Sequence, residues 1–424
     1  MSRKQNALRC MGFVSVLSLV ILCLGVGLAA PVTVQMIEFA RVDEAEWQRA
    51  VVERFNASRK DIQIELISLA GSNVHTKPLT MIAAGAPPDI SYNDPYRIIE
   101  WTHQGLVMDI TPYLNRDRAA FSEFFGPLLD LYKVNDGRYG IPIDLQVQGF
   151  FYREDFFDEA GVPYPREGMT WDDIARISPR LVVQSGDGVI TRWAIRFPQF
   201  WHWWSILWHH GAAFFDDEWS PKRFVGDSTE MRAGLEYIRS MIHDRQVMSP
   251  RTISGTTAPN LVVTGSVAMA IGNSLYMQEM VRLGHERPWD VTRLPYGPAG
   301  NNIAWFNSLG WFIISTANHP DEAWEVIKYF SSEASMRLCV EMRGTMVPHR
   351  RVSQTVWMQQ WEYPKNRRVF LDAIGTARGL PAVYGEGIQA IVDGVNAIAD
   401  GRKPIPQVIA DWDVQLNNWL KDPR

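Results

Sequence analysis

The segment YGIPIDLQVQGFFYREDFFDEAGVPYPREGMTWDD, residues 139–173, carries the signals that decide the fold. Its apolar and aromatic run Gln148–Tyr152 is typical of a buried strand. A short amphipathic turn follows and closes at Ala160-Gly161, and two prolines separate it from the next element. Thr170 predicts the N-cap of a helix, because its hydroxyl can accept a hydrogen bond from the first helical turn. The segment therefore predicts a strand followed by short helical elements.

The first 29 residues have the composition of a secretory signal peptide. Arg3, Lys4 and Arg9 precede the apolar stretch Met11–Leu28, and small residues end it at Gly27-Leu28-Ala29. The alternative is a membrane anchor, since about 18 apolar residues can just span a bilayer. The small residues at the end favour cleavage, so we expect an exported protein that is soluble in the periplasm.

Cleavage after Ala29 would change both the charge and the cysteine content. The removed segment contains three basic residues and no acidic ones, so the formal net charge changes from −5 to −8. A protein with this acidic charge offers no basic surface for nucleic acid. Cys10 and Cys23 are also lost, so Cys339 remains alone and no internal disulfide can form. Leu22 precedes Cys23 where lipid attachment needs a small residue, so we expect no lipidation. About 395 residues remain, a length that argues for two domains.

The mature sequence begins with a strand-helix-strand pattern. Val32–Phe39 and Ile62–Ile67 are rich in β-branched and apolar residues, as in buried strands. Between them, Asp43–Asn56 has apolar residues at helical spacing, with Asp43 as the expected N-cap and Glu46 three residues later. Such a unit implies a parallel sheet with right-handed crossovers.

Further helices are expected later in the chain, and no linker divides it. The expected helices lie around residues 74–84, after Pro320, over 388–399 with a stop at Gly401, and over 408–419. We find no internal repeat, no low-complexity tract and no Ser/Gly/Pro-rich joint. Two domains without such a joint are expected to share several chain crossings.

Seven segments occur in an order that resembles one family of binding proteins. They are Ala83–Ile90, Gly105–Leu114, Tyr139–Asp173, Gly265–Met269, Pro295–Pro298, Gly310-Trp311 with His319–Trp324, and Gly344 with Pro348. Together they resemble the extracellular solute-binding proteins of ABC importers, in the group that contains maltose- and other oligosaccharide-binding proteins. Arg153 departs from the asparagine usual in that family, and Asn273-Ser274-Leu275-Tyr276 replaces its usual glycine-aromatic turn. These departures affect the ligand contacts expected near them.

The resemblance implies an α/β fold of the type II periplasmic-binding-protein class, with a cleft between two lobes joined by three hinge crossings. The N-terminal lobe is expected over residues 30–146 plus 310–355, and the C-terminal lobe over 147–309 plus 356–424. It also implies a monomer that binds a small molecule, needs no cofactor and performs no chemistry. Its partners would be the membrane permease subunits of an ABC importer.

The aromatic segment Phe197–His210 is the first candidate for a ligand site. Flat aromatic faces fit the axial C–H patches of sugars, so a tryptophan-rich cleft favours a saccharide. The resemblance places Trp201 at a stacking position, with His202 and Trp203 beside it. The alternative is a buried helix face, formed by Trp204, Ile206, Leu207 and Trp208.

Polar residues beside expected strands complete the candidate site. Asn93, Asp94 and Arg97 follow a strand that starts at Asp89-Ile90, and open α/β sheets bind ligands beyond such strand ends. An Asp-Pro turn with Arg97 in solvent is the alternative. Gln146 and Gln148 lie in an apolar strand, where unpaired amides would be costly unless they face ligand hydroxyls. By resemblance, looser candidates are Arg41, Tyr276, Trp305, Asn307, Trp311 and Tyr384.

The residues give little support to a metal site or to catalysis. His209 and His210 are adjacent on an expected helix and point apart, so no metal site is expected. Asp216-Asp217-Glu218 is more typical of a solvated turn than of glycosidase carboxylates, and no hydrolase, P-loop or zincin motif is present. The sequence predicts a sugar-binding protein that serves an ABC importer. The alternatives are a betaine-like cation, a glycerol-phosphate-type ligand with Arg41 or Arg97 on the anion, and a secreted carbohydrate-active enzyme.

Overall fold

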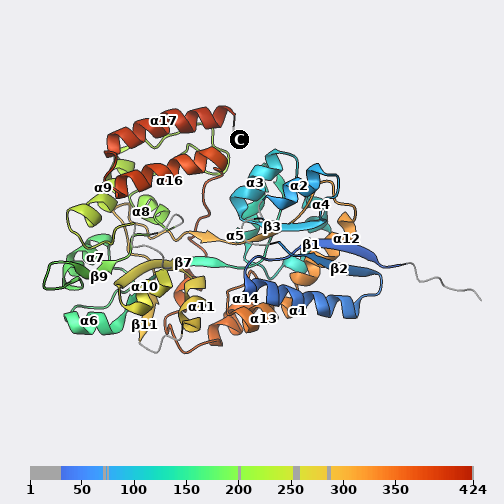
Figure 1. Ribbon diagram of the computed structural model, residues 1–424, viewed down its shortest axis with the longest axis horizontal. Coiled ribbons are helices and arrows are strands. Elements are labelled where there is room, and N and C mark those ends of the chain that lie inside the picture. Colours follow the sequence, from blue (N-terminus) through green and yellow to red (C-terminus); the bar gives the residue numbers. More distant parts are fainter. Residues whose placement is uncertain are drawn as a thin grey trace, which may run out of the picture.

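The computed structural model describes residues 30–69, 73, 76–198, 202–251, 258–283 and 288–422. Its elements form two lobes that lie side by side, each with a sheet covered by helices (Figure 1). The first lobe surrounds the sheet β2-β1-β3-β13-β6, and the second surrounds the sheet β11-β7-β10-β9-β8, with β12 paired to β7. The expected fold class, two α/β lobes of the periplasmic-binding-protein type, is therefore the observed one.

The sheet of the first lobe begins with the parallel unit that the sequence predicts. β1 pairs with β2 in parallel from Val32↔Ile62 to Ile37↔Ile67, and β3 adds in parallel on the other side of β1. The return strand β13 is antiparallel to β3. The strands are β1 (Val32–Ile37), β2 (Ile62–Ile67), β3 (Ile90–Asn93), β6 (Ile141–Pro142) and β13 (Gly310–Ile313). Covering helices include α1 (Val42–Ser58), α2 (Lys77–Ala83), α3 (Pro95–His103), α4 (Thr111–Arg116), α5 (Gly126–Leu129), α12 (Pro320–Phe330), α13 (Glu333–Arg343) and α14 (Arg350–Thr355).

The second lobe is built around the long strand β7. β7 is antiparallel to β10, and β10 is parallel to β9, so β9 and β10 end at the same edge of the sheet. The strands are β7 (Gln146–Arg153), β8 (Val183–Gln184), β9 (Ile190–Ile195), β10 (Val267–Asn273), β11 (Trp289–Thr292) and β12 (Phe306–Asn307). The helices are α6 (Glu154–Ala160), α7 (Trp171–Ile177), α8 (Trp204–His209), α9 (Thr229–His243), α10 (Ala258–Thr264), α11 (Leu275–Arg282), α15 (Arg368–Ala373), α16 (Gly385–Ala399) and α17 (Ile405–Lys421).

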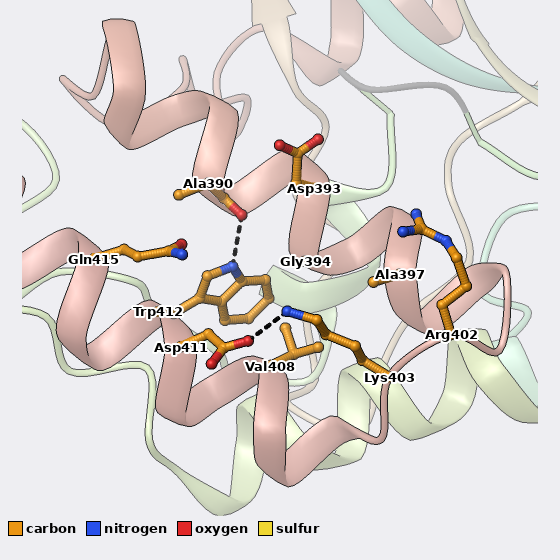
Figure 2. Close-up of a pocket in the computed structure, with 10 residues that line it drawn as sticks. All are labelled: Ala390, Asp393, Gly394, Ala397, Arg402, Lys403, Val408, Asp411, Trp412 and Gln415. Atoms are coloured by element: carbon orange, nitrogen blue, oxygen red, sulfur yellow. Dashed lines mark hydrogen bonds and ion pairs between the residues drawn. The ribbon is translucent and has the colours of Figure 1, made fainter.

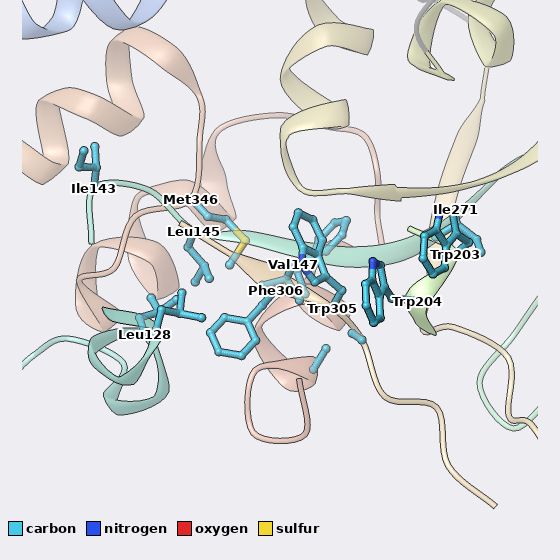
Figure 3. Packing of buried hydrophobic residues seen from close by; sticks show 14 of the residues in the cluster. Leu128, Ile143, Leu145, Val147, Trp203, Trp204, Ile271, Trp305, Phe306 and Met346 are labelled. Carbon is cyan, nitrogen blue, oxygen red and sulfur yellow. The ribbon is translucent and has the colours of Figure 1, made fainter. Parts of the chain in front are cut away.

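Backbone hydrogen bonds hold the stretches that connect the two lobes side by side. Ile143 N donates to Leu309 O at 2.8 Å, and Leu145 N donates to Met346 O at 2.9 Å. Figure 3 shows Leu145, Phe306 and Met346 close to the start of β7, where the chain passes from one lobe to the other. The expected division of the chain at residues 146, 310 and 355 stays a prediction.

Two predicted helix caps have different outcomes. Thr170 forms a full capping box with Asp173: Asp173 N donates to the Thr170 hydroxyl at 3.1 Å, and Thr170 N donates to the Asp173 carboxylate at 2.9 Å. The prediction for Asp43 is wrong, because the N-cap of α1 is Arg41 and makes no side-chain cap hydrogen bond. The Asp43 carboxylate instead contacts side chains that are distant in sequence, as described below.

Two further findings concern compartment and redox state. No helix within the described residues is long and apolar enough to cross a membrane. Cys339 is a free, buried thiol on α13, and burial raises its pKa to about 11. A buried thiol with a raised pKa is unreactive, so Cys339 is a packing residue.

Candidate functional site

The two lobes face each other across the carboxyl ends of their parallel strands. The segments that follow β1 and β3 come from the first lobe, and those that follow β9 and β10 come from the second. Gln278 Nε2 on α11 donates to Asp43 Oδ2 on α1 at 3.1 Å, and Asn307 Nδ2 on β12 donates to Asp94 Oδ1 after β3 at 3.0 Å. Ligands of open α/β sheets bind beyond such strand ends, so this region is the candidate site.

The first lobe contributes buried polar atoms that lack a partner among the described residues. Asn93 is fully buried; its Oδ1 accepts from Asp94 N at 3.1 Å, and its Nδ2 has no acceptor within the described chain. Arg97 Nε is likewise buried and unpartnered there, while its guanidinium lies 5.4 Å from the ring centroid of Tyr96. Arg41 is exposed and forms an ion pair with Asp43 at 3.3 Å. Burying a donor without an acceptor is costly, so Asn93 and Arg97 are suited to receive ligand oxygens.

Two carboxyl groups with raised pKa values, Asp94 and Asp144, belong to this region. Burial raises the pKa of Asp94 to about 6, and the hydrogen bond from Asn307 acts in the opposite direction. Asp144, just before β7, is fully buried and its pKa is raised; it accepts from Leu309 N at 2.9 Å and from Gln146 Nε2 at 3.1 Å. Sequence analysis missed Asp144, although a lone acid between Ile143 and Leu145 was a signal for a functional or hinge role.

The second lobe contributes a cluster around His202. The Tyr276 hydroxyl lies 3.5 Å from His202 Nδ1, and the rings of Tyr276 and Trp305 have centroids 5.5 and 5.9 Å from that of His202. His202 Nε2 is buried and has no partner in the described part of the chain. Burial, with a contribution from nearby Arg196, lowers the pKa of His202 to about 3, so the imidazole is neutral at physiological pH. It can therefore both donate to and accept from a ligand hydroxyl.

Some candidates make contacts other than those expected. Gln148 is satisfied within the protein: its Nε2 donates to His202 O at 3.2 Å, and its Oε1 accepts from Trp305 N at 2.8 Å and from the Ser205 hydroxyl. The reason for expecting Gln148 to face ligand hydroxyls therefore no longer holds. Trp203 is fully buried and stacks on Trp204, with ring centroids 4.9 Å apart.

The remaining candidates are distributed between the lobe cores and the space between the lobes. Trp311 on β13 is fully buried and packs 4.8 Å from Phe39 inside the first lobe. Tyr384 stacks on His103 of α3 at 5.7 Å, so this ring pair joins the two lobes. Trp201 lies outside the described residues. As ligand contacts, these residues stay predictions.

A cavity of about 760 Å³ lies between the lobes and is lined by both of them. Trp219, which is 46 % exposed, borders it and two smaller cavities that include Asn307 and Tyr384. Phe306 lines the large cavity, whereas Trp305, the previous residue, packs on His202. Since successive strand residues point to opposite faces, this cavity lies across β12 from His202. Trp219 directly follows the acidic turn 216–218 and is not among the residues predicted from the sequence.

The acidic segment 216–218 forms a turn, as expected. Asp217 Oδ1 accepts from Trp219 N and Ser220 N, both at 2.8 Å, and Asp216 Oδ1 accepts from Lys222 N and Arg223 N, both at 3.0 Å. These bonds hold the loop that carries Trp219. The described residues also contain no group of three or more His, Cys, Asp or Glu side chains that could hold a metal.

A further cavity, of about 420 Å³, lies between α16 and α17, away from the strand ends (Figure 2). Two of its polar side chains are paired: Lys403 Nζ lies 2.7 Å from Asp411 Oδ2, and Trp412 Nε1 donates to Ala390 O at 2.9 Å. This cavity therefore provides fewer free hydrogen-bonding groups for a polar ligand than the region between the lobes.

Comparison with known proteins identifies the family. Residues 41–337 match the model of the bacterial extracellular solute-binding protein family. A lactose-binding protein of Rhizobium radiobacter is 23 % identical over 297 residues, which cover 65 % of this chain and 64 % of that protein. An uncharacterized lipoprotein of Streptomyces antibioticus is 24 % identical over 293 residues, which cover 64 % of this chain and 60 % of that protein. The chain thus spans less than two thirds of the length of these curated relatives.

Solved structures show the same fold at low identity. An ABC substrate-binding protein from Listeria monocytogenes, in complex with cycloalternan, superposes with a TM-score of 0.78 at 18 % identity, over 92 % of this chain and 99 % of that one. The sugar-binding protein MalE from Xanthomonas citri superposes with a TM-score of 0.75 at 18 % identity, over 92 % and 97 % of the two chains. On the match over residues 41–337, the chain belongs to the bacterial extracellular solute-binding protein family.

Proposed function

We propose that this protein captures a sugar, as a monosaccharide, an oligosaccharide or a polyol, and delivers it to an ABC importer. The observation that carries the proposal is that residues after the strands of both lobes have buried polar atoms without a partner in the described part of the chain. Three of the atoms of this kind are Asn93 Nδ2 and Arg97 Nε in the first lobe and His202 Nε2 in the second. Sugar hydroxyls both donate and accept, so one ring can satisfy several such groups. The aromatic rings of Tyr276 and Trp305 beside His202 supply apolar faces for the ring.

The related proteins support a saccharide ligand. Their names describe lactose binding in Rhizobium radiobacter and binding of multiple sugars in Streptococcus mutans. The similar structures include complexes with cycloalternan and with maltose. These ligands belong to those proteins, and they define the classes of sugar to screen first.

The proposal includes binding without catalysis. The family consists of solute-binding proteins, and the acidic segment 216–218, which had been the alternative for glycosidase carboxylates, holds a turn through Asp216 and Asp217. Incubation with oligosaccharides should therefore leave them intact. Release of shorter sugars in proportion to protein concentration would contradict this part of the proposal.

The proposal also includes export and a membrane partner. We infer that the mature protein starts at about Ala30, is soluble in the periplasm and meets the permease subunits of an importer as a monomer. The related Streptomyces antibioticus protein is described as a lipoprotein, so the alternative of membrane anchoring must be tested. N-terminal sequencing and mass spectrometry of the exported protein decide between them. An intact Met1 or a lipid on Cys23 would contradict the proposal.

The decisive experiment is a ligand screen by thermal shift, followed by calorimetry on the hits. Neutral saccharides, acidic saccharides, betaines and phosphopolyols form the panel, because a ligand of the folded state raises the melting temperature. We expect a saccharide to give the largest shift. A shift with betaines alone would instead favour a cation-binding protein and overturn the sugar assignment.

A further inference from the structure

Arg196 occupies a position from which a side chain can reach the ligand. It follows β9 directly, and its backbone N donates to Met269 O of the parallel neighbour β10 at 3.0 Å. It therefore lies at the carboxyl edge of the second sheet, where the loops face the first lobe. The residue is only 8 % exposed. Sequence analysis did not select it, because a single arginine after a strand carries no special pattern.

The guanidinium of Arg196 has no carboxylate partner within the described chain. Within the described residues, the guanidinium makes a single, long hydrogen bond, from Nη1 to Phe197 O at 3.5 Å. Three other buried arginines have carboxylate partners: Arg153 lies 2.6 Å from Asp155, Arg192 lies 2.9 Å from Glu159, and Arg343 lies 3.0 Å from Glu44. The buried Arg367 has no such partner, but it donates to backbone carbonyls at normal distances, Pro364 O and Glu362 O both at 2.9 Å. In the sequence outside the described residues, Glu286 is the one acidic side chain. Arg196 therefore differs from the arginines that stabilise the fold.

A buried guanidinium without a counter-charge is costly. An arginine cannot escape this cost by losing its proton, because its pKa is too high, and the removal of a charge from water opposes folding. Burial lowers the pKa of Arg196, which reflects the same penalty on the charged form. A protein can retain such a group when a ligand supplies the missing negative charge.

Two polar side chains, His202 and Tyr276, interact electrostatically with Arg196. His202 lies near enough for the charge of Arg196 to lower its pKa, and Tyr276 interacts electrostatically with the same guanidinium. The Tyr276 hydroxyl and His202 Nδ1 are 3.5 Å apart, and His202 Nε2 is buried without a partner in the described residues. A guanidinium, a phenol and an imidazole together can surround an anionic group of a ligand.

We propose that the sugar bound by this protein carries a negative charge, as a uronate carboxylate or a sugar phosphate, and that Arg196 binds this group. The inference rests on the proposed function as a sugar-binding protein. A planar guanidinium can bind either anion through two parallel hydrogen bonds, with Tyr276 and His202 beside it. The Asp94 carboxylate, with a pKa of about 6, is mostly ionised at pH 7 and repels an anion from the first lobe, so the charged group faces the second lobe and the neutral hydroxyls face Asn93 and Asp94.

The test compares matched neutral and acidic sugars by titration calorimetry. One arm uses digalacturonate against a neutral galactose disaccharide, and the other uses glucose 6-phosphate against glucose, so the arms separate carboxylate from phosphate. We expect one acidic member to bind roughly tenfold or more tightly than its neutral partner, with an affinity that falls as salt rises. Arg196→Met should abolish the preference, and Arg196→Lys should retain part of it because it keeps the charge without the planar fork.

Arg192→Met is the matched control, because Arg192 is also buried on β9 but has Glu159 as its partner. This variant should melt at a lower temperature and keep the preference for the acidic sugar. Unliganded Arg196→Met should melt no lower than the wild type, since it removes an unpaired buried charge. If it melts lower and Glu286→Gln lowers the melting temperature equally, Arg196 has a structural partner and the inference is wrong.

The remaining outcomes separate the inference from the proposed function. Wild-type protein that binds neutral sugars as tightly as acidic ones overturns the inference and leaves the proposed function intact. Wild-type protein that binds neither kind, and whose melting temperature no saccharide of the ligand screen raises, overturns the proposed function itself. An acidic preference that survives in Arg196→Met shows that another residue binds the anion and contradicts the assignment to Arg196. The comparison on wild-type protein stands even if the variants fold poorly.

Discussion

The hydrogen bond between Gln278 and Asp43 provides a direct test of how the lobes close. Gln278 lies on α11 in the second lobe and Asp43 on α1 in the first, 235 positions apart, and Nε2 donates to Oδ2 at 3.1 Å. This bond exists only while these two helices are close. It can therefore stabilise the closed conformation without touching the ligand.

Gln278→Ala removes this bond and leaves the Asp43 carboxylate supported. Arg41 Nε lies 3.3 Å and Arg343 Nε 3.6 Å from that carboxylate, so no buried charge loses all its partners. The side chain of Asp43 is 31 % exposed, so the free energy that this bond contributes should lie toward the lower part of the range for hydrogen bonds to charged acceptors. The closed state should lose about 1 kcal/mol, which corresponds to roughly a fivefold weaker affinity for the sugar.

Calorimetry and stopped-flow fluorescence with the sugar from the ligand screen measure the effect. The loss should appear as faster dissociation, because the bond forms only after the lobes approach. Gln389→Ala is the control, since Gln389 donates to Asp393 at 2.9 Å within α16 and joins no lobes. It should bind and release sugar like the wild type. Equal affinity and equal dissociation rates for Gln278→Ala and the wild type would refute this account of closure.

Three further outcomes are expected. Burial raises the pKa of Asp94 to about 6, above its ordinary value of 3.8, so the penalty on its charged form is present above pH 6 and disappears as the pH falls toward 4. Asp94→Asn should therefore raise the free energy of unfolding by up to about 3 kcal/mol at pH 7 and change it little at pH 4. An equal effect at both pH values in urea titrations would contradict this. Thr170→Ala removes the capping box of α7 and should cost about 1 kcal/mol of stability in the same assay without altering sugar affinity; unchanged stability would show that the box contributes nothing. Trp201→Ala should weaken sugar binding roughly thirtyfold. Trp208→Ala, at a buried position on α8, should lower the melting temperature because it leaves a cavity, and it should not change the affinity for sugar. A Trp201 variant that binds sugar normally would place that residue in the core.

Local patterns in the sequence determined most of the secondary structure. The expected strand at Ile62–Ile67 has the bounds of β2, and the parallel pairing of β1 with β2 follows from the helix between them. Gly161 ends α6 in the left-handed conformation with a φ of 59°, at the predicted stop. The capping box at Thr170 involves residues three positions apart. These features were predictable because their determinants are periodicity, short-range hydrogen bonds and backbone preferences.

The candidate site depended on partners that are distant in sequence. Asp43 had the right position for a helix cap, yet Gln278 and Arg343 hold its carboxylate. Gln148 had the features of a ligand contact, but the Ser205 hydroxyl and Trp305 N satisfy its amide oxygen.

The missing counter-charge of Arg196 became visible only once its surroundings were known. A sequence shows which residues carry donors, acceptors and charges, and it also reveals the short-range bonds that form helices and strands. Whether a buried polar group is satisfied depends on strands and loops that come together from far apart along the chain. For this protein, the sequence alone determined the family resemblance and the local elements. The tertiary structure decided which of its polar side chains remain available to a ligand, because only there are all their neighbours present.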